Sequence, residues 1–228
     1  MKQIIVLVAV TFIVVTCFGQ ENLAPKNYKL NEEASGDLDK DGINEKAVVY
    51  NVTTQDGETD GFDREIIIYK KQKDKWVIWH RSKNAVKNSR DGGTRGDPFQ
   101  GIEIKNGILI IYHSGGSNSI WTHTDKYRFQ NNRFELIGFT ANSGSNCEEW
   151  LYYDINITTG KIVVTDELEK CDDTVHVVYK KRNEVFTHKL SQVLTLEKRY
   201  ESRYEEGDGK YIKIISPKYK HELYIFRE

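Results

Sequence analysis

The residues best suited to chemistry in this 228-residue chain are the carboxylates of the segment GDLDKDGINE at positions 36–45. Asp37, Asp39 and Asp41 occupy alternate positions, and Gly42 follows them with the backbone freedom that a tight turn requires. Carboxylates crowded this closely repel one another unless a cation neutralises them. Calcium takes roughly six to eight oxygen ligands from carboxylates, backbone carbonyls and water. The spacing therefore predicts a calcium-binding loop.

This acidic segment departs from the EF-hand pattern. An EF-hand places its bidentate Glu at loop position twelve, which is Val48 here, inside a β-rich run. The segment instead resembles the calcium loop of FG-GAP and integrin α-subunit propeller blades, in which D-x-D-x-D-G-x-x-D precedes a strand. The ligands implied by that resemblance are Asp37, Asp39, Asp41, the backbone carbonyl of Ile43, and Glu45. Glu45 stands where the family has Asp. The chain has one such loop, so the resemblance extends to the ion site and not to a propeller.

A second interpretation of the acidic segment remains open. Acidic, glycine-containing turns also occur as solvated loops that bind no ion. If an ion does bind, we expect a structural role, in which calcium pins a turn near the N-terminus of the folded part.

Candidate catalytic groups elsewhere are scattered along the chain. His113 and His123 flank a glycine loop and could meet across a hairpin, where two histidines could bind a metal. The alternative is that each is an ordinary strand residue. His113 and Ser114 are neighbours on a predicted strand, so they point to opposite faces and cannot pair as base and nucleophile. Two acidic pairs, Glu148-Glu149 and Asp172-Asp173, lie beside cysteines and offer carboxylates for acid–base hydrolysis.

Three further side chains could line a ligand surface. These are Trp121, Tyr112 and Arg128, which lie on predicted strands of the central segment. Packing of the aromatic rings within a β core is the favoured alternative.

Most of the chain that must position these groups is predicted to form hairpins. Runs rich in Val, Ile, Thr, Tyr, Phe and Trp are separated by short polar turns. A β-rich run at 46–50 follows the acidic segment. The predicted hairpins comprise residues 64–70 with 75–81, 102–105 with 108–113, 119–129 with 133–139, 150–157 with 161–165, 175–179 with 184–190, and 211–215 with 222–226. A helical period is visible only weakly, over residues 189–203.

The pattern predicts an all-β fold. We expect an antiparallel meander of hairpins, arranged as a sandwich, an open barrel or a propeller-like fragment, with at most one short helix. No linker rich in Pro, Gly and Ser interrupts residues 20–228, and a chain of that length can bury one core. We therefore expect residues 20–228 to form a single β-rich domain.

The N-terminus predicts export. Lys2 precedes an apolar run from Ile4 to Val15, which has the length of a signal-peptide core and is too short for a membrane span of roughly 20 residues. Small residues before Gln20 favour cleavage after Gly19, so residues 1–19 are predicted to be a signal peptide. The alternative is an outer-surface lipoprotein anchored through Cys17. The mature protein is then periplasmic or secreted, without a transmembrane segment.

Cysteine use and charge agree with an extracytoplasmic location. After cleavage, Cys147 and Cys171 remain, and they allow one intramolecular pairing. A bridge would close a loop of roughly 25 residues and contribute ~3 kcal/mol on the chain-entropy model; two reduced thiols are the alternative. The formal net charge of −1 gives no reason to expect nucleic acid as a partner.

The central segment suggests a class of protein without suggesting an activity. The runs GDPFQGIEI (96–104) and YHSGGS (112–117) give residues 97–162 a similarity to uncharacterised exported bacterial β-rich proteins that also carry an acidic loop. We therefore expect a cell-envelope or secreted protein, more a calcium-stabilised binding or structural module than an enzyme, with an unknown envelope ligand or protein as partner. The alternatives are a secreted hydrolase with a non-local carboxylate or histidine site, and an inhibitor or immunity-type protein.

Overall fold

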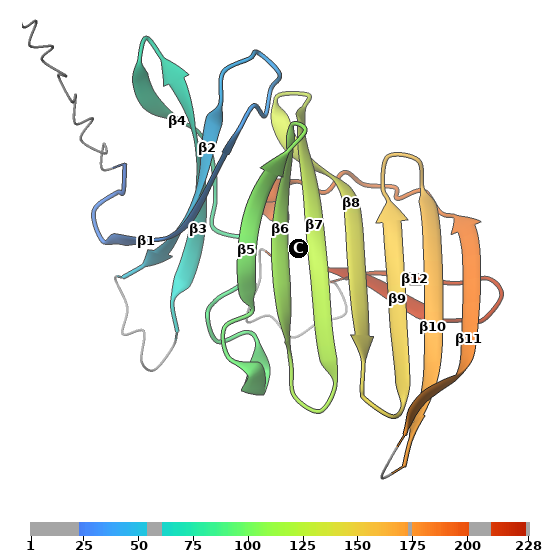
Figure 1. Ribbon diagram of the computed structural model, residues 1–228. Coiled ribbons are helices and arrows are strands. Elements are labelled where there is room, and N and C mark those ends of the chain that lie inside the picture. Colours follow the sequence, from blue (N-terminus) through green and yellow to red (C-terminus); the bar gives the residue numbers. More distant parts are fainter. Residues whose placement is uncertain (1–22, 54–60, 173–174, 201–210, 227–228) are drawn as a thin grey trace, which may run out of the picture.

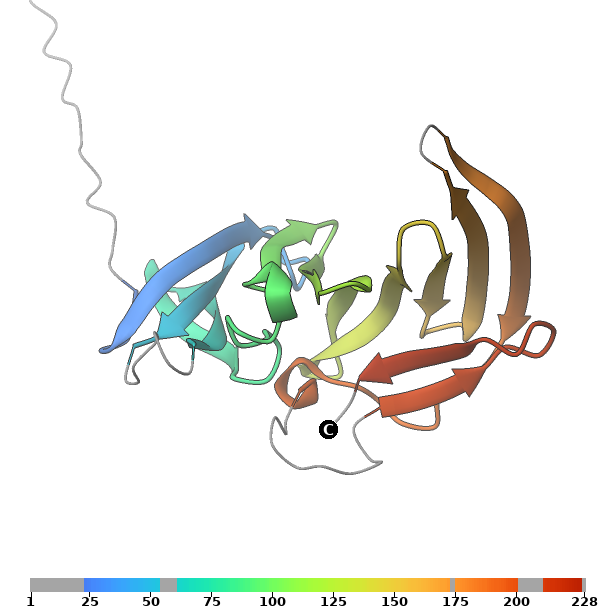
Figure 2. The same cartoon turned by 90° about the horizontal axis from the view of Figure 1, so that it is seen from below.

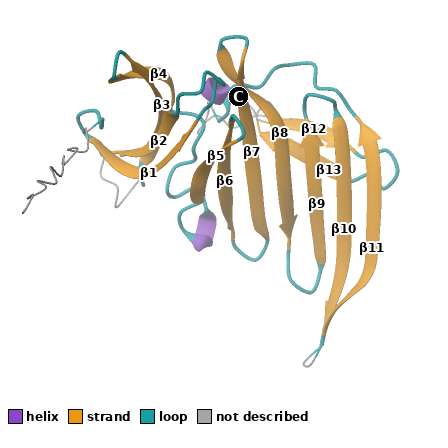
Figure 3. Ribbon diagram, turned by 45° about the horizontal axis from the view of Figure 1, so that its top comes forward, coloured by secondary structure: helices purple, strands orange, loops and turns teal. Residues whose placement is uncertain are grey.

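The computed structural model describes residues 23–53, 61–172, 175–200 and 211–226 (Figure 1). The predicted signal peptide at residues 1–19, with Cys17, therefore lies outside the described residues. Within the described part, the fold is antiparallel β-sheet with two short 3-10 turns, η1 (Gly93–Arg95) and η2 (Leu196–Lys198) (Figure 3). The predicted all-β meander is confirmed. No helix in these ranges has the length and apolar character to cross a membrane.

The strands form two open sheets and one separate hairpin, and neither sheet closes into a barrel. The four-stranded sheet consists of β1 (Tyr28–Gly36), β2 (Glu45–Val52), β3 (Asp63–Gln72) and β4 (Lys75–Ser82). The seven-stranded sheet consists of β5 (Phe99–Lys105), β6 (Ile108–Gly116), β7 (Ile120–Gln130), β8 (Arg133–Gly144), β9 (Glu149–Asn156), β10 (Lys161–Cys171) and β11 (His176–Thr187). The hairpin consists of β12 (Tyr211–Ile215) and β13 (Glu222–Phe226), and it lies across one face of the seven-stranded sheet (Figure 2).

Two-residue turns close three of the predicted hairpins. Both central residues have positive φ in Lys73-Asp74, Asn106-Gly107 and Asn131-Asn132. Turns of this kind match the right-handed twist of the flanking strands, and Asn and Gly adopt positive φ more readily than other residues. Local turn chemistry thus sets the register of β3–β4, β5–β6 and β7–β8.

One predicted hairpin is wrong. Residues 175–179 and 184–190 were expected to pair around a turn at Lys181-Arg182-Asn183, but residues 176–187 form the single strand β11. Asn183 lies opposite Thr165, and its Oδ1 accepts a hydrogen bond of 2.8 Å from the Thr165 hydroxyl. Pairing along the full length of β10 therefore overrides the polar composition of this stretch.

One hydrophobic core connects all three sheets. On β6 and β7, alternate side chains are buried, which gives a buried face with period two. On β2 and β3, the side chains of both faces are buried, because a second hydrophobic cluster packs on the face that points away from this core. Buried members of this core include Leu38, Leu109, Ile111, Tyr127, Phe139, Tyr153, Leu223 and Ile225. The inward face of β6 and β7 also carries polar residues, and these belong to the candidate site.

Candidate functional site

The acidic loop, Asp37–Asn44, connects β1 to β2. Leu38 is 1% exposed and packs in the core, and its N–H donates a 2.8 Å hydrogen bond to Glu45 Oε2. The N–H of Gly42 donates to Asp37 Oδ2 at 3.0 Å, and Gly42 has a φ of 87° that few other residues adopt. A buried leucine and a left-handed glycine thus fold the loop back on its own carboxylates.

Three of the five predicted ligands converge. Asp37, Asp39 and Glu45 each offer a carboxylate oxygen, and these three oxygens lie within 4.8 Å of one another. Glu45 is fully buried, and its Oε1, like Asp37 Oδ1, has no hydrogen-bond partner within the described residues. Burial raises the pKa of Glu45, and the nearby charge of Asp39 adds to the rise. The cluster is a set of hard oxygen donors able to hold a metal ion.

Asp41, another predicted ligand, lies outside this cluster of side chains. Asp41 Oδ2 is 2.8 Å from the Nζ of Lys70 on β3, and the same ammonium binds Asp39. This contact lowers the pKa of Asp41 and raises that of Lys70. The side chain of Ile43 is exposed, and its N–H donates to Asp41 Oδ1 at 2.8 Å. Lys70 therefore neutralises one side of the loop, a role that sequence reasoning missed because β3 lies far away in the chain.

The acidic loop also packs against the other sheet. A Cβ placed on Gly107, in the β5–β6 turn, would lie 3.2 Å from Lys40 Cε and 3.4 Å from the carbonyl oxygen of Asp37. A Cβ on Gly36 would lie 2.5 Å from Ile104 Cγ2. The two glycines permit this close approach, which places the carboxylate cluster at the seam between the two sheets.

A second group of polar residues lies on the inward face of β6 and β7. His113 and His123 are opposite each other in the β6–β7 register, and their ring centroids are 4.9 Å apart. They do meet across the hairpin, as predicted, and both are buried. Burial lowers the pKa of both histidines; the neighbouring His123 lowers that of His113 further, and Arg199 lowers that of His123. Both rings are therefore neutral at pH 7.

Two residues that follow β11 in the chain, Arg199 and Tyr200, contact buried residues of β7. Arg199 donates from Nε and Nη2 to the two oxygens of Asp125, each at 2.9 Å, and both residues are fully buried. Tyr200 Oη lies 2.6 Å from His123 Nε2 and 3.3 Å from Asp125 Oδ2. We refer to His113, His123, Asp125, Arg199 and Tyr200 as the buried cluster.

In the buried cluster, the negative charge of Asp125 is balanced by the positive charge of Arg199, so Asp125 is not placed to act as a general base. The carboxylate of Asp125 is neutralised by a bidentate guanidinium, the geometry of a strong ion pair. Burial raises the pKa of Tyr200 well above its usual value, so its hydroxyl stays protonated. This arrangement supports packing and orientation of neighbouring side chains. The sequence could have indicated that Asp125 is buried, because it lies two residues before Tyr127 on a strand with alternating character and therefore on the same face. No sequence pattern indicated a role for Arg199.

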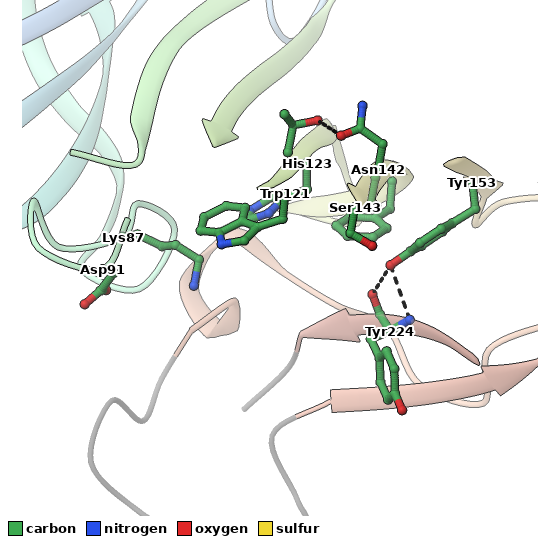
Figure 4. A pocket seen from close by; sticks show the side chains of 11 residues that line it. Lys87, Asp91, Trp121, His123, Asn142, Ser143, Tyr153 and Tyr224 are labelled. Atoms are coloured by element: carbon green, nitrogen blue, oxygen red, sulfur yellow. Dashed lines mark hydrogen bonds between the residues drawn. The ribbon is translucent and has the colours of Figure 1, made fainter. Parts of the chain in front are cut away.

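A cavity of about 380 Å³ adjoins the buried cluster (Figure 4). Its sheet side is formed by Trp121 and His123 on β7, Phe139 and Ala141 on β8, and Tyr153 on β9. Tyr224 on β13 closes one side, and Tyr153 Oη donates 2.9 Å to the Tyr224 carbonyl. Lys87 and Asp91, from the connection between β4 and β5, line the opposite side. The volume falls in the range of small-molecule sites, roughly 300–1,000 Å³.

The connection that carries Lys87 is held in place on both sides. The backbone N–H of Lys87 donates a hydrogen bond to His113 Nε2 at 3.3 Å, and the Lys87 carbonyl accepts one from Arg64 Nη1 at 3.2 Å. Arg64 is 1% exposed and also binds both oxygens of Asp97. The Lys87 ammonium lies 4.4 Å from the centre of the Tyr200 ring. The four-stranded sheet, through Arg64 on β3, thus positions a cavity on the seven-stranded sheet.

Of the three side chains considered as a ligand surface, Trp121 lines the cavity. Its indole stacks on His123 with the rings inclined by 12° and their centroids 5.3 Å apart. Tyr112 donates a 2.9 Å hydrogen bond to Glu103 on the neighbouring strand. Lys87, Tyr153 and Tyr224 are cavity residues that sequence reasoning missed, because the chain brings them together only in three dimensions.

The predicted disulfide bond is present. Cys147, in the β8–β9 turn, is bonded to Cys171 at the end of β10. This bridge indicates a non-cytoplasmic, oxidising environment. The acidic pairs beside it have separate roles, since Glu149 faces Arg182 at 3.5 Å and Asp172 accepts the N–H of Val175 at 2.8 Å. Asp173 lies outside the described residues.

Comparison of this chain with protein families, curated proteins and solved structures found no similar protein. No protein-family model matches the chain, and no curated protein and no solved structure is significantly similar to it. We therefore infer the function from the acidic loop, the buried cluster and the cavity.

Proposed function

We propose that this protein is an exported binding module of the cell envelope or the extracellular medium. Calcium would stabilise it at the acidic loop, and a small molecule would occupy the cavity. The disulfide and the apolar N-terminal run support export to the periplasm or beyond. The proposal assigns calcium to Asp37, Asp39, Asp41, the carbonyl of Ile43, and Glu45.

One observation carries the calcium assignment. Among the described residues, no hydrogen-bond donor reaches two buried carboxylate oxygens, Asp37 Oδ1 and Glu45 Oε1, which lie next to a third carboxylate from Asp39. A buried, unpartnered carboxylate oxygen destabilises the native state, and a bound cation removes that penalty. The donors are all oxygens, which favours calcium over zinc, and Lys70 would move off Asp39 and Asp41 as the ion enters.

Thermal unfolding of residues 20–228 tests this assignment. We expect saturating calcium, relative to EGTA, to raise the Tm by ~5–10 °C, because a ligand that binds only the native state stabilises it by mass action. Asp39→Ala should abolish the rise. Asp74→Asn, at an exposed position in the β3–β4 turn, is the matched control and should retain it. An equal Tm with and without millimolar calcium would reduce the acidic loop to a lysine-neutralised turn.

The cavity supports binding more strongly than it supports hydrolysis. A carboxylate-based hydrolase needs two carboxylates facing each other in a cleft. Among the described residues that line the cavity, Asp91 supplies the only carboxylate. The carboxylate of Asp125, next to the cavity, is engaged with Arg199. A pocket that combines aromatic walls with polar and charged side chains, as this one does, is typical of a ligand-binding site.

A further inference from the structure

The cavity has an aromatic wall, whose Phe139 and Tyr153 rings are inclined to each other by 46°. Trp121 stacks on His123, and Phe139 and Tyr153 continue the same inward face on β8 and β9, with ring centroids 6.1 Å apart. Ala141 lies between His123 and Tyr153 in the register of the sheet, and its small side chain leaves room above the sheet. Aromatic side chains stack favourably on planar ligands and exclude water from them. The wall therefore fits a planar, apolar body.

The charges around the cavity favour an anion. Lys87 extends beside Trp121, whereas the Asp91 carboxylate points away from the aromatic side chains (Figure 4). Asp91 is exposed to solvent and its Oδ2 already accepts the N–H of Asn88 at 3.1 Å. Behind the wall, the Arg199 guanidinium lies 5.3 Å from the centre of the Phe139 ring. That guanidinium is paired with Asp125, so among the described residues Lys87 is the cationic side chain that lines the cavity itself.

Two polar groups of the wall already have partners within the protein. Asn142 Oδ1 accepts a 2.9 Å hydrogen bond from the Thr122 hydroxyl, and Tyr153 Oη donates to the backbone of β13. A sugar needs several unengaged donors and acceptors, because its hydroxyls lose water on entering a site. An apolar body with one charged group makes fewer such demands.

We propose that the cavity binds a small organic anion with a planar apolar body, whose carboxylate pairs with the Lys87 ammonium while its rings lie against Trp121 and Tyr153. This inference depends on the proposed binding function and specifies its ligand class. Lys87 is suited to the role because its backbone is fixed by His113 and Arg64, so its side chain extends from an ordered segment.

Two probes of equal shape test the inference by isothermal titration calorimetry. We expect 2-naphthoate to bind residues 20–228 with a Kd at least about tenfold lower than that of the neutral 2-naphthylmethanol, since a partly desolvated ion pair contributes roughly that factor. Lys87→Met should bring the two Kd values together, and Lys87→Arg should preserve the difference. Lys83→Met, which removes an exposed charge from the same connection, is the matched control.

A cavity-filling variant establishes the location. Ala141→Phe should abolish binding of both probes, and a circular dichroism melt checks that this variant and Lys87→Met remain folded. Equal affinity of the wild type for both probes would overturn the anionic class and leave the binding function standing. Failure of both probes to bind the wild type, or retention of their binding by folded Ala141→Phe, would overturn the cavity as a site. The calcium-dependent Tm is unaffected by either result, so the two proposals fail separately.

Discussion

The acidic loop and the buried cluster both gather charge, but they do so in opposite ways. The loop brings like charges together from one short segment, and two of its buried oxygens have no hydrogen-bond partner in the part of the chain that the structure describes. The buried cluster pairs Asp125 with Arg199 across a sequence separation of 74 residues. Matched charge can be buried in the core, whereas unmatched charge at a seam needs an external partner. At the acidic loop, the proposed calcium ion would be that partner.

The largest effect is expected from breaking the matched pair. Asp125→Asn leaves the Arg199 guanidinium buried without its counter-charge and should lower the free energy of unfolding by ~3–5 kcal/mol. Urea denaturation measures this loss. The double variant Asp125→Leu/Arg199→Leu should lose less than Asp125→Asn, because no unpaired charge remains. A double variant that is less stable than the single one would contradict the account of matched charge.

Acid should weaken the buried cluster. His113 and His123 have pKa values below 6.5 in the native state, so the unfolded chain binds more protons just below that pH. Their contribution to stability is therefore present above pH 6.5 and is lost as the pH falls toward the native pKa values. Each histidine contributes a slope of about 1.4 kcal/mol per pH unit in that window. Denaturation from pH 7 to pH 5 measures the slope, and His123→Phe should reduce it by about half.

Mild acid should have the opposite effect at the acidic loop when calcium is absent. The native pKa of Glu45 is raised above its usual 4.5, so its contribution to stability is present below that pH and is lost as the pH rises through the native value. In EGTA, Glu45→Gln should therefore become more favourable relative to the wild type as the pH rises from 4.5 to 7. Calcium should reverse the preference for Gln, because the ion requires the carboxylate. Glu148→Gln, at an exposed acid elsewhere, is the control.

The smallest effect is expected from the lysine that partly neutralises the loop. Lys70→Met removes the ammonium bound to Asp39 and Asp41, and should strengthen calcium binding about two- to fivefold by removing a competitor for the same oxygens. Calcium titration of the two proteins measures the ratio of Kd values. Weaker calcium binding by Lys70→Met would show that the lysine orients the carboxylates instead of competing with the ion.

Local sequence determined a large part of this protein. Period-two alternation and polar turns identified five of the six predicted hairpins, because strand faces and turn dihedrals are set by neighbouring residues. The carboxylate cluster was also visible, because Asp37, Asp39 and Glu45 lie within nine residues of one another in the sequence. The pairing of Cys147 with Cys171 followed from their number. The strand β11 was misread, because its polar residues 181–183 are stabilised by pairing with β10 and not by local preference.

Tertiary structure decided the rest. Lys70 reaches the acidic loop from β3, and Arg199 reaches Asp125 from beyond the last strand of the large sheet. The cavity combines residues of β7, β8, β9, β13 and the β4–β5 connection. Such contacts join residues that are distant in the chain, and their positions depend on how two sheets and a hairpin pack around one core. Residue spacing encodes which side chains share a strand face, but it carries no information on which faces meet.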